Sequence, residues 1–122
     1  MPEKLILIHE RKLPIHIGEL ANKLGHQAKV VVSARNKSAE KLFTSGIPDV
    51  YVVGYNWSLS LEDSKSAIAD VSWTREHHPD VKIIAWQDYK EREDFIKAGA
   101  VDFVRRESSV TEDLIEAIRK YV

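Results

Sequence analysis

Residues 50–60 read VYVVGYNWSLS, in which four apolar residues are followed by a glycine and then by polar and aromatic side chains. A short, continuous apolar run bounded in this way is typical of a strand that is buried on both faces of a parallel sheet. Gly54 then marks the end of this strand. Because ligands bind beyond the carboxyl ends of the strands in open α/β sheets, we expect the functional site near Gly54.

Similar apolar runs recur along the chain and alternate with stretches of helical periodicity. Strands are predicted over 4–8, 29–33, 50–53, 81–86 and 101–104, and helices over 14–24, 38–45, 61–76, 90–98 and the residues after 109. Right-handed crossovers between parallel strands then place helices on both faces of the sheet. The sequence therefore predicts one α/β domain spanning residues 1–122, a doubly wound five-stranded parallel sheet in a flavodoxin-like (βα)5, three-layer αβα sandwich.

Local signals mark the ends of the later helices. Ser60 with Asp63, and Ser109 with Glu112, match the spacing of N-terminal capping pairs. His77 ends the third helix together with His78 and Pro79, and we interpret these histidines as a solvated helix end. Periodicity predicts that the third helix buries Leu61, Ile68 and Val71 or Ser72, and that the last helix buries Leu114, Ile115 and Ile118.

Composition excludes several classes of function. The 122 residues include 18 basic and 19 acidic side chains, so no basic excess exists to drive direct nucleic-acid binding. The absence of cysteine excludes disulfides, thiolate catalysis and the common structural zinc sites, and it suits a reducing cytoplasm. The apolar run near the N-terminus is too short to span a membrane. We expect a cytoplasmic protein without a membrane association or a cofactor.

Residues 98–122, AGAVDFVRRESSVTEDLIEAIRKYV, resemble the C-terminal end of the receiver domains of bacterial two-component response regulators. That family reads AGA-x-D-[YF]-[LIV]-x-K-P, and Arg106 stands at the position of its lysine. Residues 48–53, PDVYVV, are similar to the family's entry to its third strand. The number and order of elements and the chain length also agree, so the resemblance covers essentially the whole chain. The matching residues in the first motif are Ala98, Gly99, Ala100, Asp102, Phe103 and Val104.

The resemblance implies a switch that receives a phosphoryl group on an aspartate at the end of the third strand. Two acids after the first strand then hold Mg²⁺, a serine or threonine ends the fourth strand, and a lysine ends the fifth. The carboxylate is the nucleophile, while the metal and the lysine neutralise charge on the phosphoryl oxygens and the hydroxyl reports their arrival.

This chain departs from that pattern at each functional position. Gly54 stands where the acceptor aspartate would be, Trp86 where the hydroxyl would be, and His9–Glu10 where the acidic pair would be. Arg106 keeps a positive charge but presents a planar fork in place of a compact ammonium. One glutamate with the carbonyl of Asn56 is a poor ligand set for Mg²⁺. We therefore expect a pseudo-receiver with no catalytic or metal-binding residue, which is not an enzyme; its degenerate phosphorylation pocket comprises His9, Glu10, Gly54, Asn56, Trp86 and Arg106.

Two questions about the residues at the end of this strand stay open. Gly54 either accommodates a turn or leaves space for the indole of Trp86, which would then fill the pocket. Trp57 and Trp86 either pack at the rim, or form an aromatic patch for a protein partner, or stack on a small ligand. A metal pair at His9–Glu10 is disfavoured because adjacent strand residues point to opposite faces.

In some receiver families, charges on one face of the domain form salt bridges between two copies, so the resemblance implies a surface for self-association. Arg92, Asp94, Asp102 and Arg119 form either a solvated face or a set of dimer salt bridges on the fourth-helix, fifth-strand, fifth-helix face. We expect a phosphorylation-independent signalling module that binds a protein partner or an output domain and forms a homodimer through this face. The alternatives are a phosphotransfer receiver with a non-standard acceptor and a flavodoxin-like domain that binds a small ligand.

Overall fold

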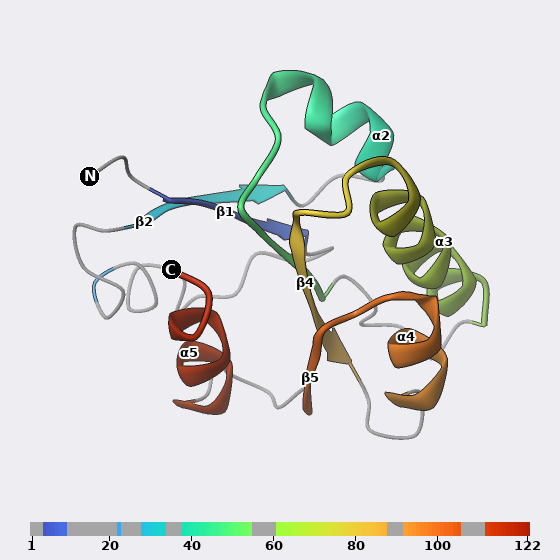
Figure 1. Ribbon diagram of the computed structural model, residues 1–122. Helices are drawn as coiled ribbons and strands as arrows, with labels where there is room; N and C mark the ends of the chain where they lie inside the picture. Colours follow the sequence, from blue (N-terminus) through green and yellow to red (C-terminus); the bar gives the residue numbers. More distant parts are fainter. Residues whose placement is uncertain are drawn as a thin grey trace.

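The computed structural model describes residues 4–9, 22, 28–33, 38–54, 61–87, 92–105 and 112–122, with the backbone alone for 28–33, 61–66 and 87. Its sheet has the strand order β2-β1-β3-β4-β5, and every neighbouring pair is parallel (Figure 1). The strands are β1 (Lys4–His9), β2 (Ala28–Ser33), β3 (Val50–Val53), β4 (Lys82–Gln87) and β5 (Asp102–Arg105). The predicted α/β fold with a parallel sheet is confirmed.

Helices lie on both faces of the sheet. α5 covers one face, whereas α2, α3 and α4 cover the other (Figure 1). The helical segments are α2 (Ala39–Leu42), the 3₁₀ helix η2 (Phe43–Ser45), α3 (Leu61–His77), α4 (Arg92–Ala98) and α5 (Glu112–Arg119). The helix predicted over 14–24 falls almost entirely outside the described residues.

The two faces of β3 explain why this strand is apolar throughout. All four of its side chains are fully buried. Val50 and Val52 belong to the cluster under α5, which we call the α5-side core. Tyr51 and Val53 belong to the cluster under α2, α3 and α4, which we call the α3-side core. Because successive side chains of a strand point to opposite faces of the sheet, this single apolar run contributes residues to both cores.

Several of the helical positions that periodicity predicted as buried are buried in the structure. Leu114, Ile115 and Ile118 of α5 are buried, as predicted. In α3, Val71 is buried and Ile68 is partly buried, whereas Ser72 is exposed. The helix predicted over 38–45 changes to 3₁₀ geometry at Phe43 and ends at Gly46, whose φ of 147° favours glycine.

Asp49 aligns three strands at the edge of the sheet opposite to the strand carboxyl ends. Its carboxylate Oδ2 accepts a hydrogen bond from the Leu5 amide (2.8 Å), and its own amide donates to the Leu5 carbonyl (2.8 Å). The Asp49 carbonyl accepts a hydrogen bond from the Lys82 amide (3.0 Å). This residue therefore sets the starts of β1, β3 and β4, and with them the positions of the strand ends.

Candidate functional site

The carboxyl ends of β1, β3 and β4 bring three predicted pocket residues together. His9 pairs with Val53, and the amide of Gly54 donates a hydrogen bond to the His9 carbonyl (2.9 Å). Val53 pairs with Ala85, so the same register sets buried Gly54 beside Trp86. The remaining predicted pocket residues, Glu10, Asn56 and Arg106, lie outside the described residues together with Trp57, and the statements about them stay predictions.

Trp86 lies in the α5-side core and is only 1% exposed. Its place on the interaction surface, and its use as a platform for a stacked ligand, were therefore wrong predictions. The reason is strand alternation, since residue 86 shares a face with Ile84 and that face is covered by α5. Gly54 continues the alternation of Val50 and Val52 and so belongs to the same face. That arrangement favours the interpretation in which the glycine leaves space for the indole.

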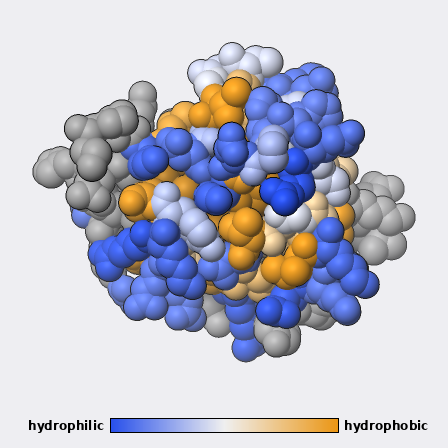
Figure 2. Space-filling view, viewed as in Figure 1, coloured by the Kyte–Doolittle hydropathy of each residue, from blue (hydrophilic) through white to orange (hydrophobic). Residues whose placement is uncertain are grey.

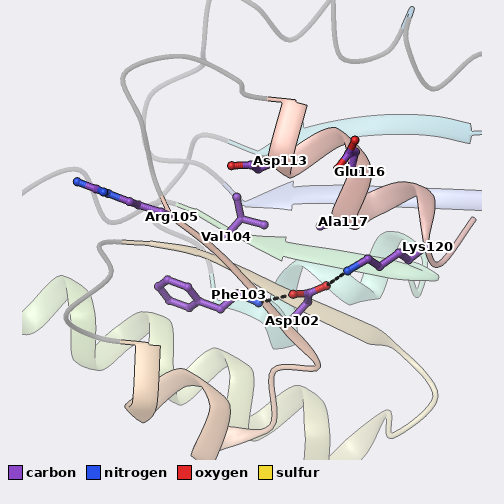
Figure 3. Close-up of a pocket in the computed structure, with 8 residues that line it drawn as sticks. All are labelled: Asp102, Phe103, Val104, Arg105, Asp113, Glu116, Ala117 and Lys120. Carbon is purple, nitrogen blue, oxygen red and sulfur yellow. Dashed lines mark hydrogen bonds and ion pairs between the residues drawn. The ribbon is translucent and has the colours of Figure 1, made fainter.

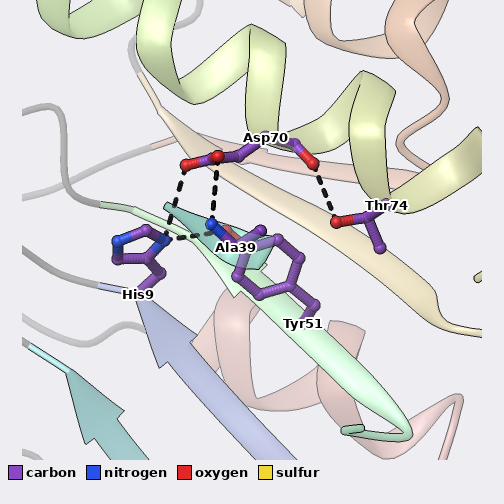
Figure 4. Close-up of polar contacts among 5 residues, drawn as sticks. All are labelled: His9, Ala39, Tyr51, Asp70 and Thr74. Atoms are coloured by element: carbon purple, nitrogen blue, oxygen red, sulfur yellow. Dashed lines mark hydrogen bonds and ion pairs between the residues drawn. The ribbon is translucent and has the colours of Figure 1, made fainter. Parts of the chain in front are cut away.

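His9 points into the opposite core and takes part in a buried polar network (Figure 4). Its Nδ1 forms a hydrogen bond with Tyr51 Oη at 2.7 Å and lies 3.8 Å from Asp70 Oδ2. Asp70 Oδ1 accepts a hydrogen bond from the Ala39 amide at the start of α2 (3.1 Å). The network thus joins β1, β3, α3 and the start of α2.

Sequence reasoning missed Tyr51 and Asp70 as members of this site. Tyr51 was the one residue with a polar atom in the strand 50–53, and Asp70 lies beside the apolar position Val71 in α3. A buried tyrosine hydroxyl or carboxylate needs a hydrogen-bond partner, so each of the two residues indicated a buried polar contact. Neither signal identifies the partner, because the three side chains come from distant segments.

The described part of the chain offers neither a metal-binding cluster nor a membrane-spanning helix. There, no group of three or more His, Cys, Asp or Glu side chains is arranged to hold a metal ion. None of the helices in those same ranges is both long and apolar enough to cross a membrane.

The face formed by α4, β5 and α5 carries the four charged residues predicted for self-association. Arg92, Asp94 and Arg119 are exposed, and Asp102 is half-buried. Asp102 accepts hydrogen bonds from the Phe103 amide (2.9 Å) and from Lys120 Nζ (3.3 Å) (Figure 3). β5 is an edge strand of the sheet, so this face presents charges of both signs along an edge.

An open pocket of about 260 Å³ lies between β5 and α5 on this face (Figure 3). Acidic and basic side chains both line it, together with three apolar residues; the lining comprises Asp102, Phe103, Val104, Arg105, Asp113, Glu116, Ala117 and Lys120. Figure 2 shows a mostly hydrophilic surface with apolar areas among the hydrophilic residues. Ile96 of α4 and Val101, just before β5, are among the exposed large apolar side chains (39% and 44% exposed).

Comparison with known proteins adds structural relatives. No family model and no curated protein matches the chain. The signal receiver domain of a DNA-binding response regulator (merR) from Colwellia psychrerythraea 34H is similar, with a TM-score of 0.76, 14% identity and 97% of each chain covered. HP1043, an orphan response regulator of H. pylori, has a TM-score of 0.72 at 18% identity over 98% of each chain. The Thermotoga maritima response regulator DrrB, an OmpR/PhoB homologue, has a TM-score of 0.71 at 16% identity, with 98% of this chain and 52% of DrrB covered.

These structural relatives share the overall fold of the chain over nearly its whole length. Their sequence identities are low, so the likeness concerns the fold. The chain has the fold of a response-regulator receiver domain.

Proposed function

We propose that this receiver-fold domain is a pseudo-receiver, a cytoplasmic and non-enzymatic regulatory module that binds another protein without being phosphorylated. The observation that carries the proposal is Gly54. This residue follows β3 directly, is buried, and lies between the His9 backbone and the register position of Trp86. A glycine at the position where the family's acceptor aspartate would stand has no nucleophile to offer.

The neighbours of Gly54 support the same proposal. Trp86 takes the position of the reporting hydroxyl and is buried in the α5-side core. His9 takes the position of one Mg²⁺-binding acid, but its Nδ1 is hydrogen-bonded to Tyr51 in the α3-side core. An imidazole held in this way is a poor ligand for Mg²⁺, which prefers oxygen.

Phosphorylation is tested directly by intact mass. The purified chain is incubated with saturating small-molecule phosphodonor and Mg²⁺, and we expect no mass gain. A receiver with an intact acidic pocket, treated in parallel, confirms that the donor is active. Gly54→Asp is expected to stay unlabelled as well, since the hydroxyl and the acidic pair remain absent. Labelling of the unaltered chain would support the phosphotransfer alternative, and labelling of Gly54→Asp alone would show that the pocket is otherwise competent.

Binding to another protein or to an output domain is the second part of the proposal. The match covers 52% of DrrB, so the receiver fold in that protein is joined to further sequence. Affinity capture of the full-length protein with identification by mass spectrometry tests this part. A partner whose capture is the same with and without a phosphodonor is expected, whereas a partner captured only after phosphodonor treatment would contradict it.

Self-association through the α4–β5–α5 face is the third part. Exposed charges of both signs, and the apolar side chains of Ile96 and Val101, favour a second copy as its occupant. We expect a dimer in sedimentation experiments at low salt and less dimer at high salt, because exposed ion pairs are screened. Arg119→Glu should weaken the dimer, whereas Lys41→Glu on α2, exposed on a different helix, should not. Equal effects of the two variants would place the interface elsewhere.

A further inference from the structure

A chain of aromatic contacts runs from the strand-end site through the α3-side core. The rings of His9 and Tyr51 are stacked, with centroids 5.9 Å apart. Tyr51 meets Phe43 edge-to-face at 5.3 Å, and Phe43 meets Trp73 edge-to-face at 5.6 Å. These four residues come from β1, β3, η2 and α3, so the contacts cross from the sheet into the helical layer.

The series of aromatic contacts reaches the surface at the C-terminal end of α3. Trp73 is half-buried and stacks on exposed His77, with centroids 4.8 Å apart and planes at 20°. His77 Nδ1 also donates a hydrogen bond to the Trp73 carbonyl (2.9 Å). The ring of His78 contacts the rings of both Phe43 and Trp73, with centroids 5.4 Å apart in each pair. His77 is thus exposed at the helix end, as predicted, and both histidines also pack on Trp73, which borders the α3-side core.

A second connection leaves His9 through Asp70. The carboxylate lies 3.8 Å from His9 Nδ1 and accepts a hydrogen bond from the Ala39 amide, while Thr74 Oγ1 donates to the Asp70 carbonyl (2.8 Å) (Figure 4). Ala39 begins α2, and Phe43 begins η2 directly after it. The α2–η2 segment is thus held at its start by Asp70 and, where α2 passes into η2 at Phe43, by Tyr51.

Burial makes these contacts sensitive to one another. His9 is 1% exposed, and Tyr51 is fully buried. Interiors are close-packed, so a ring that moves displaces the ring beside it. A buried polar atom that loses its partner is also costly, which favours a concerted rearrangement over a broken hydrogen bond.

We propose that His9, Tyr51, Phe43 and Trp73 form an aromatic relay, by which a change at the strand-end site alters the α2–η2 segment and the exposed Trp73–His77 surface. The inference rests on the proposed function, because in a pseudo-receiver the signal at this site is a contact with a partner in place of a phosphoryl group. His9 and Tyr51 act as positioning residues. The relay lies on the α3 side of the sheet, whereas Trp86, at the position of the family's reporting hydroxyl, faces α5.

Coupling is established by a response and not by contact alone, so the test perturbs one end and observes the other. The full chain is labelled with fluorotryptophan, and the fluorine resonances of Trp57, Trp73 and Trp86 are assigned with single Trp→Phe variants. We expect His9→Leu and Tyr51→Phe to shift the Trp73 resonance while the Trp86 resonance stays in place. Ile8→Val is the matched control, because Ile8 is the neighbouring residue in β1, is fully buried and belongs to the α5-side core. It should leave Trp73 unchanged.

Variants are compared only where circular dichroism shows a folded chain with a cooperative melt. If His9→Leu does not fold, Tyr51→Phe decides, since it removes a single hydroxyl. A folded variant with an unchanged Trp73 resonance, or with equal shifts of Trp73 and Trp86, would overturn the relay. The outcome is independent of the mass measurement on phosphodonor-treated protein, so failure of the relay and failure of the pseudo-receiver proposal are distinguishable.

Discussion

The two cores of this domain use the same strands but differ in polarity. In β1, Ile6 and Ile8 enter the α5-side core, whereas Leu7 and His9 belong to the α3 side. Among the described residues, the buried members of the α5-side core are apolar side chains, in which the indole N–H of Trp86 is the one polar group. The α3-side core surrounds the buried polar residues His9, Asp70 and Thr74 and the Tyr51 hydroxyl. Apolar packing is non-directional, whereas hydrogen bonds require specific partners. The α5-side core therefore contributes apolar burial, and the α3-side core fixes the positions of the strands and helices relative to one another.

The largest expected effect is a cavity in the α5-side core. Leu114 is fully buried, so Leu114→Ala should lower the free energy of unfolding by about 2–5 kcal/mol. Urea denaturation measures this loss. Exposed Glu116 on the same helix provides the control, and Glu116→Ala should change the stability by no more than about 0.5 kcal/mol. Similar losses in the two variants would mean that α5 does not pack as described.

Removing the carboxylate of Asp70 should have the next largest effect. Asp70→Ala leaves the buried Ala39 amide without its acceptor, at a cost of about 1–3 kcal/mol. Asp70→Asn keeps an oxygen at the Oδ1 position and should lose less. Hydrogen exchange of the Ala39 amide reports the local effect, with faster exchange expected in the alanine variant. Equal stabilities of the alanine and asparagine variants would argue against a positioning role for this hydrogen bond.

The third effect concerns the contact between α3 and the end of α4. Gly99 has a φ of 126°, and an added Cβ would lie 2.7 Å from Arg75 Cγ. Gly99→Ala should therefore cost about 1–3 kcal/mol through backbone strain alone, with an added steric part. Arg75→Ala in the same chain should relieve the contacts with Cγ and Cδ but not the one with Arg75 Cβ at 2.8 Å, and a double-mutant cycle in urea measures the relieved part. Full recovery in the double variant would show that the backbone at residue 99 is not strained.

Much of the fold could be predicted because it follows from local patterns. The apolar run 50–53 predicted a strand buried on both faces, and Leu114, Ile115 and Ile118 predicted the buried face of the last helix. The side of the sheet to which Trp86 points was harder. Alternation defines faces only relative to neighbouring residues, so the choice between rim and core required the position of α5.

The candidate site likewise contains one residue that could be placed from the sequence and others that could not. Gly54 could be placed from the sequence, because its offset from the P-D pair at residues 48 and 49 is a property of the chain itself. The partners of His9 could not be placed in that way. Tyr51 is 42 residues away along the chain, and Asp70 comes from a helix that reaches His9 only when α3 packs on the sheet.

Residue types and their spacing alone specified a parallel α/β domain whose third strand ends in a glycine without a nucleophile. Both features depend on neighbours within a few residues, where covalent geometry and side-chain period suffice. Packing decided that Trp86 is buried under α5, and that His9, Tyr51 and Asp70 meet under α3. Those contacts join residues that are distant in the sequence and meet only when the helices pack on the sheet. A buried polar group needs a hydrogen-bond partner, and the folded structure decides which group lies close enough to be that partner.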